Sequence, residues 1–150
     1  MLRLSKKSDY ALMAVRHLAL PDEPSSTSAR EIAERYDIPL PLMAKVLQRL
    51  VRAGLLVSTQ GTRGGYTLSR VPAMISVSDV IQAIDGPVMV TACSTDNNDC
   101  DQYSKCSIRD PLWQIRERIA ATLATVTIAE MAAESNAVQA PAALAAVTKR

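Results

Sequence analysis

Residues 28–68 carry the ordered pattern that most restricts how this chain can fold. Ser28 is followed three residues later by Glu31, a capping box that predicts a short helix over residues 29–36. A turn with two prolines comes next, and apolar residues then recur with helical spacing up to Gly54, which predicts a second helix. Two short helices joined by a tight turn are typical of a helix-turn-helix.

A glycine-rich hairpin is expected directly after these helices. Residues 55–58 and 66–68 have the composition of short strands, and the segment 59–65 between them contains three glycines. A hairpin that follows a helix-turn-helix is typical of the wing of a winged helix. An ordinary connecting hairpin is the alternative.

All three cysteines of the chain, Cys93, Cys100 and Cys106, lie on one polar segment. Turn-forming residues between them predict a loop, and three thiols on one loop suggest a soft metal or an iron–sulfur cluster. The spacing is too open for the usual zinc site, and the odd count argues against a closed disulfide framework. A zinc site and a reactive-thiol sensor remain as alternatives.

An apolar stripe over residues 112–126 predicts a long helix after the cysteines, with Asp110 as its cap and Pro111 at its first position. On a chain of 150 residues, so long a stripe needs a partner surface, and we expect it to form a dimer. Packing within its own monomer is the alternative. The residues expected at the dimer interface are Leu112, Ile115, Ile119 and Leu123.

Composition agrees with a mainly α fold that carries a small β-hairpin wing. The chain has no Phe and only 3% aromatic residues, so its core must be aliphatic. A net charge of +2 permits nucleic-acid binding without demonstrating it. We expect no membrane span and no signal peptide, and therefore a cytoplasmic location that suits unpaired thiols. An enzyme is not expected, because C-x-x-C and cofactor fingerprints are absent from the sequence.

The expected architecture is a winged helix-turn-helix followed by a long C-terminal dimerisation helix. Ser76 and Asp79 begin a helix before the cysteines, and a capping box at Thr127 and Glu130 begins a short last helix. The expected segments are a DNA-binding head (1–72), a connecting helix and linker (73–92), the cysteine loop (93–109), the dimerisation helix with the short last helix (110–133), and a mobile tail (134–150).

DNA contacts are expected from the second helix of the helix-turn-helix and from the wing. The N-terminal end of that helix offers few hydrogen-bond donors, so we expect specificity to come largely from DNA shape. Arg63 lies among glycines, where the backbone can approach a narrow minor groove. For Arg49 and Arg52 the alternative is a solvated helix face. The candidate contacts are Arg30, Lys45, Gln48, Arg49, Arg52, Gln60, Thr62, Arg63, Gly64, Gly65 and Tyr66.

Several motifs occur in an order that is specific when taken together. They are Leu4–Leu12, the helix-turn-helix from Ile32 to Leu50, Gly54-Leu55, Arg63–Tyr66, Asp85-Gly86-Pro87 and the three cysteines. On these residues the chain resembles the Rrf2 family of bacterial winged-helix regulators, from about Met1 to Met131. Within that family it is most similar to regulators of the SUF iron–sulfur assembly system.

The resemblance implies a homodimer with an iron–sulfur cluster, 2Fe-2S or 4Fe-4S, on the three cysteines. It implies a transcriptional regulator, expected to be a repressor of SUF-type assembly genes, whose DNA affinity depends on the cluster. The partner would be a pseudo-palindromic double-stranded operator that is A·T-rich in part. The alternatives are a regulator of the same family that responds to nitric oxide, iron or redox state, and a cluster-free thiol-based or structural DNA-binding protein.

The resemblance leaves the fourth ligand of the cluster open. Some members of the family use a histidine three residues after the last cysteine, and this chain has Arg109 there. Others use an acidic residue in the first helix of the partner subunit, and Asp9 matches that position. Asp99 and Asp101, inside the loop, are further candidates. The only histidine, His17, is expected to be a packing or surface residue rather than a ligand.

Overall fold

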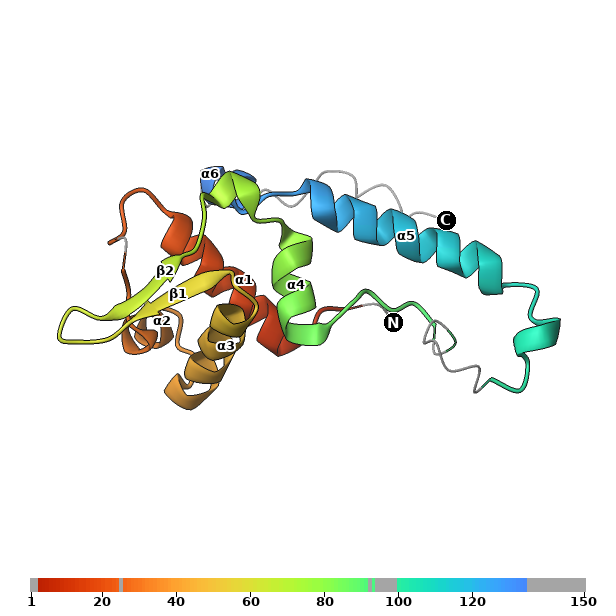
Figure 1. The fold of residues 1–150 in the computed structure, drawn as a ribbon, viewed down its shortest axis with the longest axis horizontal. Coiled ribbons are helices and arrows are strands. Elements are labelled where there is room, and N and C mark those ends of the chain that lie inside the picture. The colour runs from red at the N-terminus through yellow and green to blue at the C-terminus, as the bar shows by residue number, and fades with distance from the viewer. Residues whose placement is uncertain (1–2, 25, 92, 94–99, 135–150) are drawn as a thin grey trace, which may run out of the picture.

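The computed structural model describes residues 3–24, 26–91, 93 and 100–134. Their fold is mainly helical, with one antiparallel hairpin (Figure 1). The elements in chain order are α1 (Lys6–Ala19), α2 (Ala29–Arg35), α3 (Leu40–Arg52), β1 (Leu56–Thr59), β2 (Gly65–Leu68), the 3-10 turn η1 (Pro72–Met74), α4 (Val77–Asp85), the 3-10 turn η3 (Tyr103–Lys105), α5 (Arg109–Thr125) and α6 (Ile128–Ala133).

The predicted capping boxes are confirmed. At the start of α2, the Glu31 amide donates to Ser28 Oγ at 3.2 Å and Glu31 Oε2 accepts from the Ser28 amide at 2.7 Å. The predicted box at the start of α6 has the same reciprocal arrangement, and so does the start of α4, where the sequence predicted a helix start but no capping box. Each box satisfies two amides that the first helical turn leaves without a partner, so a motif of four residues is enough to position a helix start.

The predicted start of α5 was wrong. The helix begins at Arg109, two residues before Pro111, and its N-cap residue is Ile108, which makes no side-chain cap. Asp110 does not cap the helix, because it lies inside the first turn, where its carboxylate accepts a hydrogen bond from Arg109 Nε at 2.8 Å. Pro111 is tolerated at the third helical position, because amides of the first turn have no acceptor within the helix.

The head has an aliphatic core into which α1, α2, α3 and α4 each direct one face. Asp37, in the turn between α2 and α3, takes a positive φ of 52°. This turn places Ile38 in the core, where the Ile38 amide donates to the Ala33 carbonyl at 2.9 Å. The largest fully buried side chains include Ile32, Met43, Leu47, Leu50, Ile75 and Ile128.

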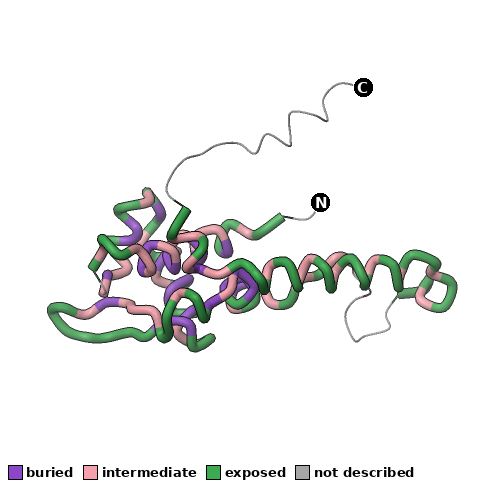
Figure 2. The backbone as a smooth tube through the Cα atoms, turned by 90° about the horizontal axis from the view of Figure 1, so that it is seen from above, coloured by how far each residue is buried: buried purple, intermediate pink, exposed green. Residues whose placement is uncertain are grey.

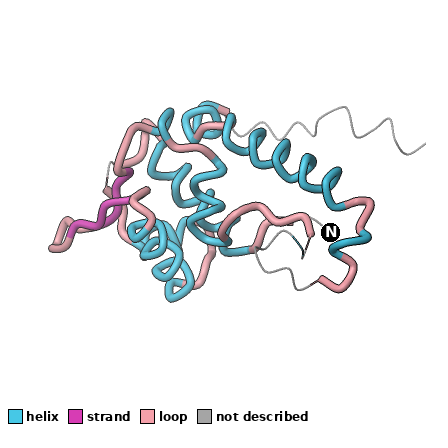
Figure 3. Tube along the Cα trace, turned by 45° about the vertical axis from the view of Figure 1, so that its right-hand side comes forward, coloured by secondary structure: helices cyan, strands magenta, loops and turns pink. Residues whose placement is uncertain are grey.

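The predicted hairpin after α3 is also confirmed. β1 and β2 pair antiparallel, from Leu56 opposite Leu68 to Thr59 opposite Gly65. Thr27 pairs with Tyr66 on the other side of β2, through reciprocal amide–carbonyl hydrogen bonds of 3.2 and 2.9 Å. The hairpin tip extends beyond the helices of the head, as a wing does (Figure 3).

After α4 the chain leaves the head and later returns to it. α5 extends away from the head as an arm, and none of its residues is buried (Figures 1 and 2). Backbone hydrogen bonds hold residues 126–128 to the head. The Val77 amide donates to the Val126 carbonyl, and the Ile128 amide donates to the Ile75 carbonyl, each at 2.9 Å. Ile128 is fully buried in the core of the head. The segment boundaries drawn from the sequence stay predictions, but this core uses residues far beyond position 72.

No helix in the described part of the chain combines the length and the apolar character needed to cross a lipid bilayer. The predicted tail over residues 134–150 lies outside the described residues, apart from Glu134.

Candidate nucleic-acid interface and cysteine segment

Four of the predicted DNA contacts share one exposed face of α3. Lys45, Gln48, Arg49 and Arg52, together with Ala44, line a shallow hollow of about 460 Å³. The opposite face of α3 is buried in the core, which fixes the helix about its axis and turns the polar face outward. Three cationic side chains on one surface helix can contact the phosphates on either side of a groove.

Arg49 also makes an internal contact. Its Nη1 donates to the carbonyl of Ile84 at 2.9 Å, in the last turn of α4. A guanidinium has five N–H donors, so Arg49 can hold α3 to α4 and still offer donors to solvent. Sequence reasoning did not find this contact, because the two residues are 35 positions apart in the chain.

The wing contributes a second group of predicted contacts. Gln60, Thr62 and Arg63 are exposed at the hairpin tip. Gly64 and Gly65 shape the hairpin, because a Cβ at Gly64 would overlap the Thr59 carbonyl oxygen and one at Gly65 would lie 2.8 Å from the Thr27 backbone. Of these five residues, the first three therefore have side chains free to reach a groove.

The last two predicted contacts lie in β2 and in α2. Tyr66 is half-buried and packs against the core, so only part of its side chain is open to solvent. Arg30, in the first turn of α2, is exposed. Its Nη1 lies 4.0 Å from Oε1 of Glu34, one turn later. An exposed ion pair of this kind holds its side chains weakly, so Arg30 stays available to a phosphate.

The three cysteines are free thiols. Cys93 and Cys106 are half-buried and Cys100 is exposed. Cys93 Sγ lies 3.3 Å from Thr91 Oγ1, and the Tyr103 amide donates to the Cys100 carbonyl at 2.9 Å. Within residues 3–24, 26–91, 93 and 100–134, no three His, Cys, Asp or Glu side chains gather at metal-binding distance.

The donor set nevertheless fits an iron–sulfur cluster chemically. Three thiols without disulfides are the soft ligands that such clusters require. Of the fourth-ligand candidates, Asp9 is half-exposed in the first turn of α1, Asp101 is exposed beside Cys100, and Asp99 lies outside the described residues. His17 is buried in the head as expected, with its Nδ1 3.0 Å from the Tyr36 hydroxyl, and it is not part of the cysteine segment.

Asp85 joins the end of α4 to the start of α1, a link that sequence reasoning missed. Asp85 Oδ1 accepts from Ser5 Oγ at 2.8 Å and Oδ2 accepts from Ser8 Oγ at 2.7 Å. Burial disfavours the charged carboxylate, but the hydrogen bonds from Ser8 and Ser5 and the charge of Arg49 prevail, and the pKa of Asp85 lies below its ordinary value. The only signal in the sequence was the Asp-Gly-Pro run at a helix end.

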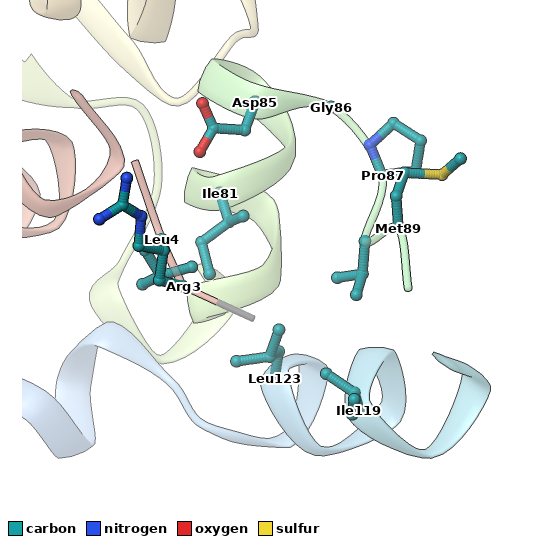
Figure 4. A pocket seen from close by; sticks show the side chains of 10 residues that line it. Arg3, Leu4, Ile81, Asp85, Gly86, Pro87, Met89, Ile119 and Leu123 are labelled. Carbon is teal, nitrogen blue, oxygen red and sulfur yellow. The ribbon is translucent and has the colours of Figure 1, made fainter. Parts of the chain in front are cut away.

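A mostly apolar cavity of about 400 Å³ separates this junction from the arm. Ile119 and Leu123 of α5 point into it from one side, and Ile81 and Asp85 of α4 lie on another (Figure 4). Gly86, Pro87, Val88 and Met89, which lead toward Cys93, also line it, together with Arg3 and Leu4. The cavity therefore brings together the arm, the end of α4 and the approach to the cysteines.

Comparison with known proteins places this geometry in a family. Residues 4–134 match the family model described as Rrf2, iron-dependent transcriptional regulator. The HTH-type transcriptional regulator IscR of Klebsiella pneumoniae is 33% identical over 131 residues, which cover 87% of this chain and 79% of that protein.

Solved structures agree with the sequence match. CymR, described as the global cysteine regulator of B. subtilis, superposes with a TM-score of 0.69 at 27% identity, covering 88% of this chain and 97% of CymR. IscR of T. potens superposes with a TM-score of 0.65 at 28% identity, covering 87% of this chain and 85% of that one. The family match includes the head, all three cysteines and α5. The chain therefore belongs to the Rrf2 family of transcriptional regulators, which are DNA-binding proteins and not enzymes.

Proposed function

We propose that this chain is a homodimeric regulator that senses an iron–sulfur cluster and represses SUF-type cluster assembly genes, with a DNA affinity set by the cluster. The observation that carries the proposal is the set of three free thiols, Cys93, Cys100 and Cys106, between a DNA-binding head and an exposed helical arm. The description of the family as iron-dependent and the likeness to IscR support it. Free thiols also agree with a reducing cytoplasm.

Cys93, Cys100 and Cys106 would hold the cluster, whichever type it is, and Asp9 of the partner subunit is the proposed fourth ligand. The bound group would supply a redox-sensitive and oxygen-sensitive link between segments that thiols alone do not tie together. A carboxylate is a harder ligand than a thiolate and holds iron less firmly. An iron held by a carboxylate would be lost more readily than one held by a thiolate. Ready loss of the cluster under stress suits a sensor.

DNA contact is assigned to the exposed face of α3 and to the wing. In a winged helix-turn-helix the second helix lies in the major groove, and the wing can enter the neighbouring minor groove. Lys45, Gln48, Arg49 and Arg52 form the face on α3, and Arg63 is the cation nearest the wing tip. An operator that is A·T-rich where the wing lies would offer the narrow minor groove that attracts arginine.

Two copies of the arm would form the dimer. On α5, Trp113 is 36% and Ile115 is 45% exposed, although both are large apolar side chains. Ile115, Ile119 and Leu123 also line a shallow groove along the arm, together with Arg118 and Thr122. Burial of this face against a second copy would remove that apolar area from water and would present two heads to the two halves of a pseudo-palindrome.

The junction around Asp85 offers a route from the cysteines to α3. The segment from Gly86 leads to Cys93, Asp85 holds the start of α1, and the neighbouring carbonyl of Ile84 holds Arg49 of α3. A displacement of this segment would therefore move Ile84 and Asp85, the residues that hold α3 and α1. To regulate, the two states of the cysteine segment must differ in their affinity for DNA.

A cluster-free thiol-based regulator is the second candidate. It is favoured by the likeness to CymR, whose description concerns cysteine. In that case oxidation of the cysteines, rather than loss of a cluster, would change the affinity for DNA.

Purification under strict exclusion of oxygen tests the proposal. The expected protein is coloured, and iron and acid-labile sulfide measured per chain match a cluster. Its affinity for operator DNA at fixed salt should change when the cluster is removed by a chelator. Colourless protein that contains no iron, but whose DNA affinity responds to thiol oxidants, would support the second candidate and overturn the first.

A further inference from the structure

Arg109 occupies the position that the family resemblance gives to a histidine ligand, and its contacts are unusual for a side chain on a surface segment. Its guanidinium carbon lies 4.5 Å from the centre of the Tyr103 ring, within range of a cation–π interaction. Its Nη1 donates to the Tyr103 carbonyl at 3.3 Å, and its Nε donates to Asp110 Oδ1 at 2.8 Å. The guanidinium therefore contacts both ends of the segment from Tyr103 to Asp110.

Cys106 lies within the segment that these contacts close. Turn hydrogen bonds of 2.9 Å from the Tyr103 amide to the Cys100 carbonyl and from the Lys105 amide to the Gln102 carbonyl shape the chain that leads to it. Cys106 is half-buried, as Cys93 is, while Cys100 is exposed. On the other side α5 begins at Arg109, so Cys106 is held between a 3-10 turn and the arm.

The charge of Arg109 adds to this arrangement. Hydrogen bonding to Asp110, and to a smaller extent the charges of Asp110, Tyr103 and Cys106, raise the pKa of Arg109 above its ordinary value, although burial acts in the opposite direction. A guanidinium does not release its proton in proteins and lacks the free nitrogen lone pair of a neutral imidazole. Arg109 therefore cannot replace a histidine as a ligand, and it places a permanent cation near a thiol.

We infer that Arg109 is a positioning residue that closes the segment 103–110 around Cys106 before a cluster binds, so that Cys106 is a pre-organised ligand. The inference takes the presence of a cluster from the proposed function. Its geometry comes from the contacts of Arg109. The arm and Cys106 would then form one unit, to which Cys93 and Cys100 would add the other two thiol ligands.

The test compares Arg109→Gln and Arg109→Lys with the parent protein. Glutamine removes both the charge and the planar fork of donors, and lysine keeps the charge but loses the fork. Arg116→Gln is the matched control, because Arg116 lies on the same helix, 6.0 Å from the centre of the Trp113 ring, and pairs with Glu117 in the next position, as Arg109 pairs with Asp110. The segment that Arg116 contacts contains no cysteine.

The first measurement uses cluster-free protein and follows tryptic cleavage after Lys105 by mass spectrometry. If Arg109 closes the segment, Arg109→Gln and Arg109→Lys should both be cleaved there several-fold faster than the parent, while Arg116→Gln should match the parent. Equal rates in all four proteins would show that the segment is not held by Arg109 and would overturn the inference.

The second measurement uses protein loaded with a cluster without oxygen and follows its absorbance after addition of excess chelator. Both Arg109 variants should begin with the parental spectrum, because their ligands are unchanged, and should lose it several-fold faster. Cys106→Ala should instead lack the spectrum from the start. If the parent keeps its cluster and the Arg109 variants lose theirs no faster than Arg116→Gln, the inference alone is overturned. A parent that takes up no iron would overturn the proposed function and, with it, this role of Arg109.

Discussion

Arg63 is the residue at which recognition by the wing can be tested most directly. It is exposed at the hairpin tip, where its guanidinium can enter a narrow minor groove. Arg63→Ala is expected to weaken binding to an operator by about 1–3 kcal/mol and to reduce the preference for A·T-rich flanks. Titration of labelled duplexes at fixed salt gives both quantities.

Two further variants show what kind of contact Arg63 makes. Lys45→Ala on α3, if that side chain contacts phosphate, should weaken specific and non-specific binding alike and flatten the dependence on salt. Arg116→Ala makes the same change of charge on the arm and should leave operator binding at the parental value. An Arg63→Ala protein with parental affinity would remove the wing from the recognition of DNA.

Asp85 is expected to stabilise the head through its charge. Because its pKa is lowered in the folded protein, its contribution is present above the unfolded-state pKa of about 3.9 and is lost as the pH falls through the lower folded value. Asp85→Asn should lower the free energy of unfolding by about 1 kcal/mol at pH 7, a value at the low end because the carboxylate is exposed to solvent. Urea unfolding at a series of pH values measures this difference.

The pH profile distinguishes charge from packing at this junction. The difference between the parent and Asp85→Asn should be constant from pH 5 to 7 and should shrink below about pH 4. Asp22→Asn, in an exposed turn of the head, is the matched control and should follow the parent at every pH. If the difference in the free energy of unfolding between the parent and Asp85→Asn is unchanged at pH 3, the effect comes from side-chain packing and not from the carboxylate charge.

Which residues could be predicted from sequence depends on how far away their partners are. Ser28 was found because its partner, Glu31, is three residues away. Asp85 was not, because Ser5 and Ser8 are 80 and 77 residues away from it. Asp110 shows that even a local rule can fail, since the helix begins one residue earlier, at Arg109, and Asp110 lies inside its first turn.

Among the elements, α5 makes the clearest prediction about assembly. Its apolar side chains at Ile115 and Ile119 are only partly covered by the rest of the chain. If α5 forms the proposed dimer, Ile115→Asp or Ile119→Asp is expected to give monomers, because a carboxylate without a partner would be buried in the proposed interface. Light scattering at micromolar concentration measures the mass directly.

The control for this prediction lies on the same helix. Gln114→Asp adds the same charge to an exposed polar position of α5 and should leave the dimer intact. Circular dichroism should show parental helix content in all three variants, so that loss of the dimer is not confused with loss of the fold. A dimer of unchanged mass in both isoleucine variants would place the interface elsewhere.

The periodicity of apolar residues predicted that α5 exists, but not its direction relative to the head. Apolar residues at helical spacing follow from the sequence, and the helix does extend from Arg109 to Thr125. Its direction is fixed by backbone pairing of residues 75–77 with residues 126–128, which no side-chain pattern reports. In the same way, the spacing of the three cysteines predicts what they can bind and not how the chain folds around a bound group.

At the scale of the whole molecule, Asp9 tests the proposed dimer and the cluster together. It can reach the cysteine segment of the partner only if the dimer brings α1 of one copy beside that segment of the other. Asp9→Ala should change the stability of the fold by only about 0.3–1 kcal/mol, as expected for an acid in the first turn of a helix. It should nevertheless speed the loss of the cluster in air or alter its spectrum, as followed by absorbance.

Cysteine variants provide the comparison for Asp9→Ala. Replacement of Cys93, Cys100 or Cys106 by alanine should abolish stable binding of the cluster, whereas Asp9→Ala should only weaken it. If Asp9→Ala keeps the parental spectrum and lifetime, the fourth ligand lies elsewhere, and Asp99, Asp101 or a ligand from outside the protein becomes the leading candidate.

The burial of Ile128 in the head has a consequence for how the protein is made. Ile75 forms its backbone hydrogen bond with Ile128, and Val77 with Val126. Both partners are synthesised about fifty residues later. Contacts between such distant parts of a chain form late, because the long loop between them must close first. During translation, therefore, the three cysteines leave the ribosome before residues 126–128 can complete the core of the DNA-binding head.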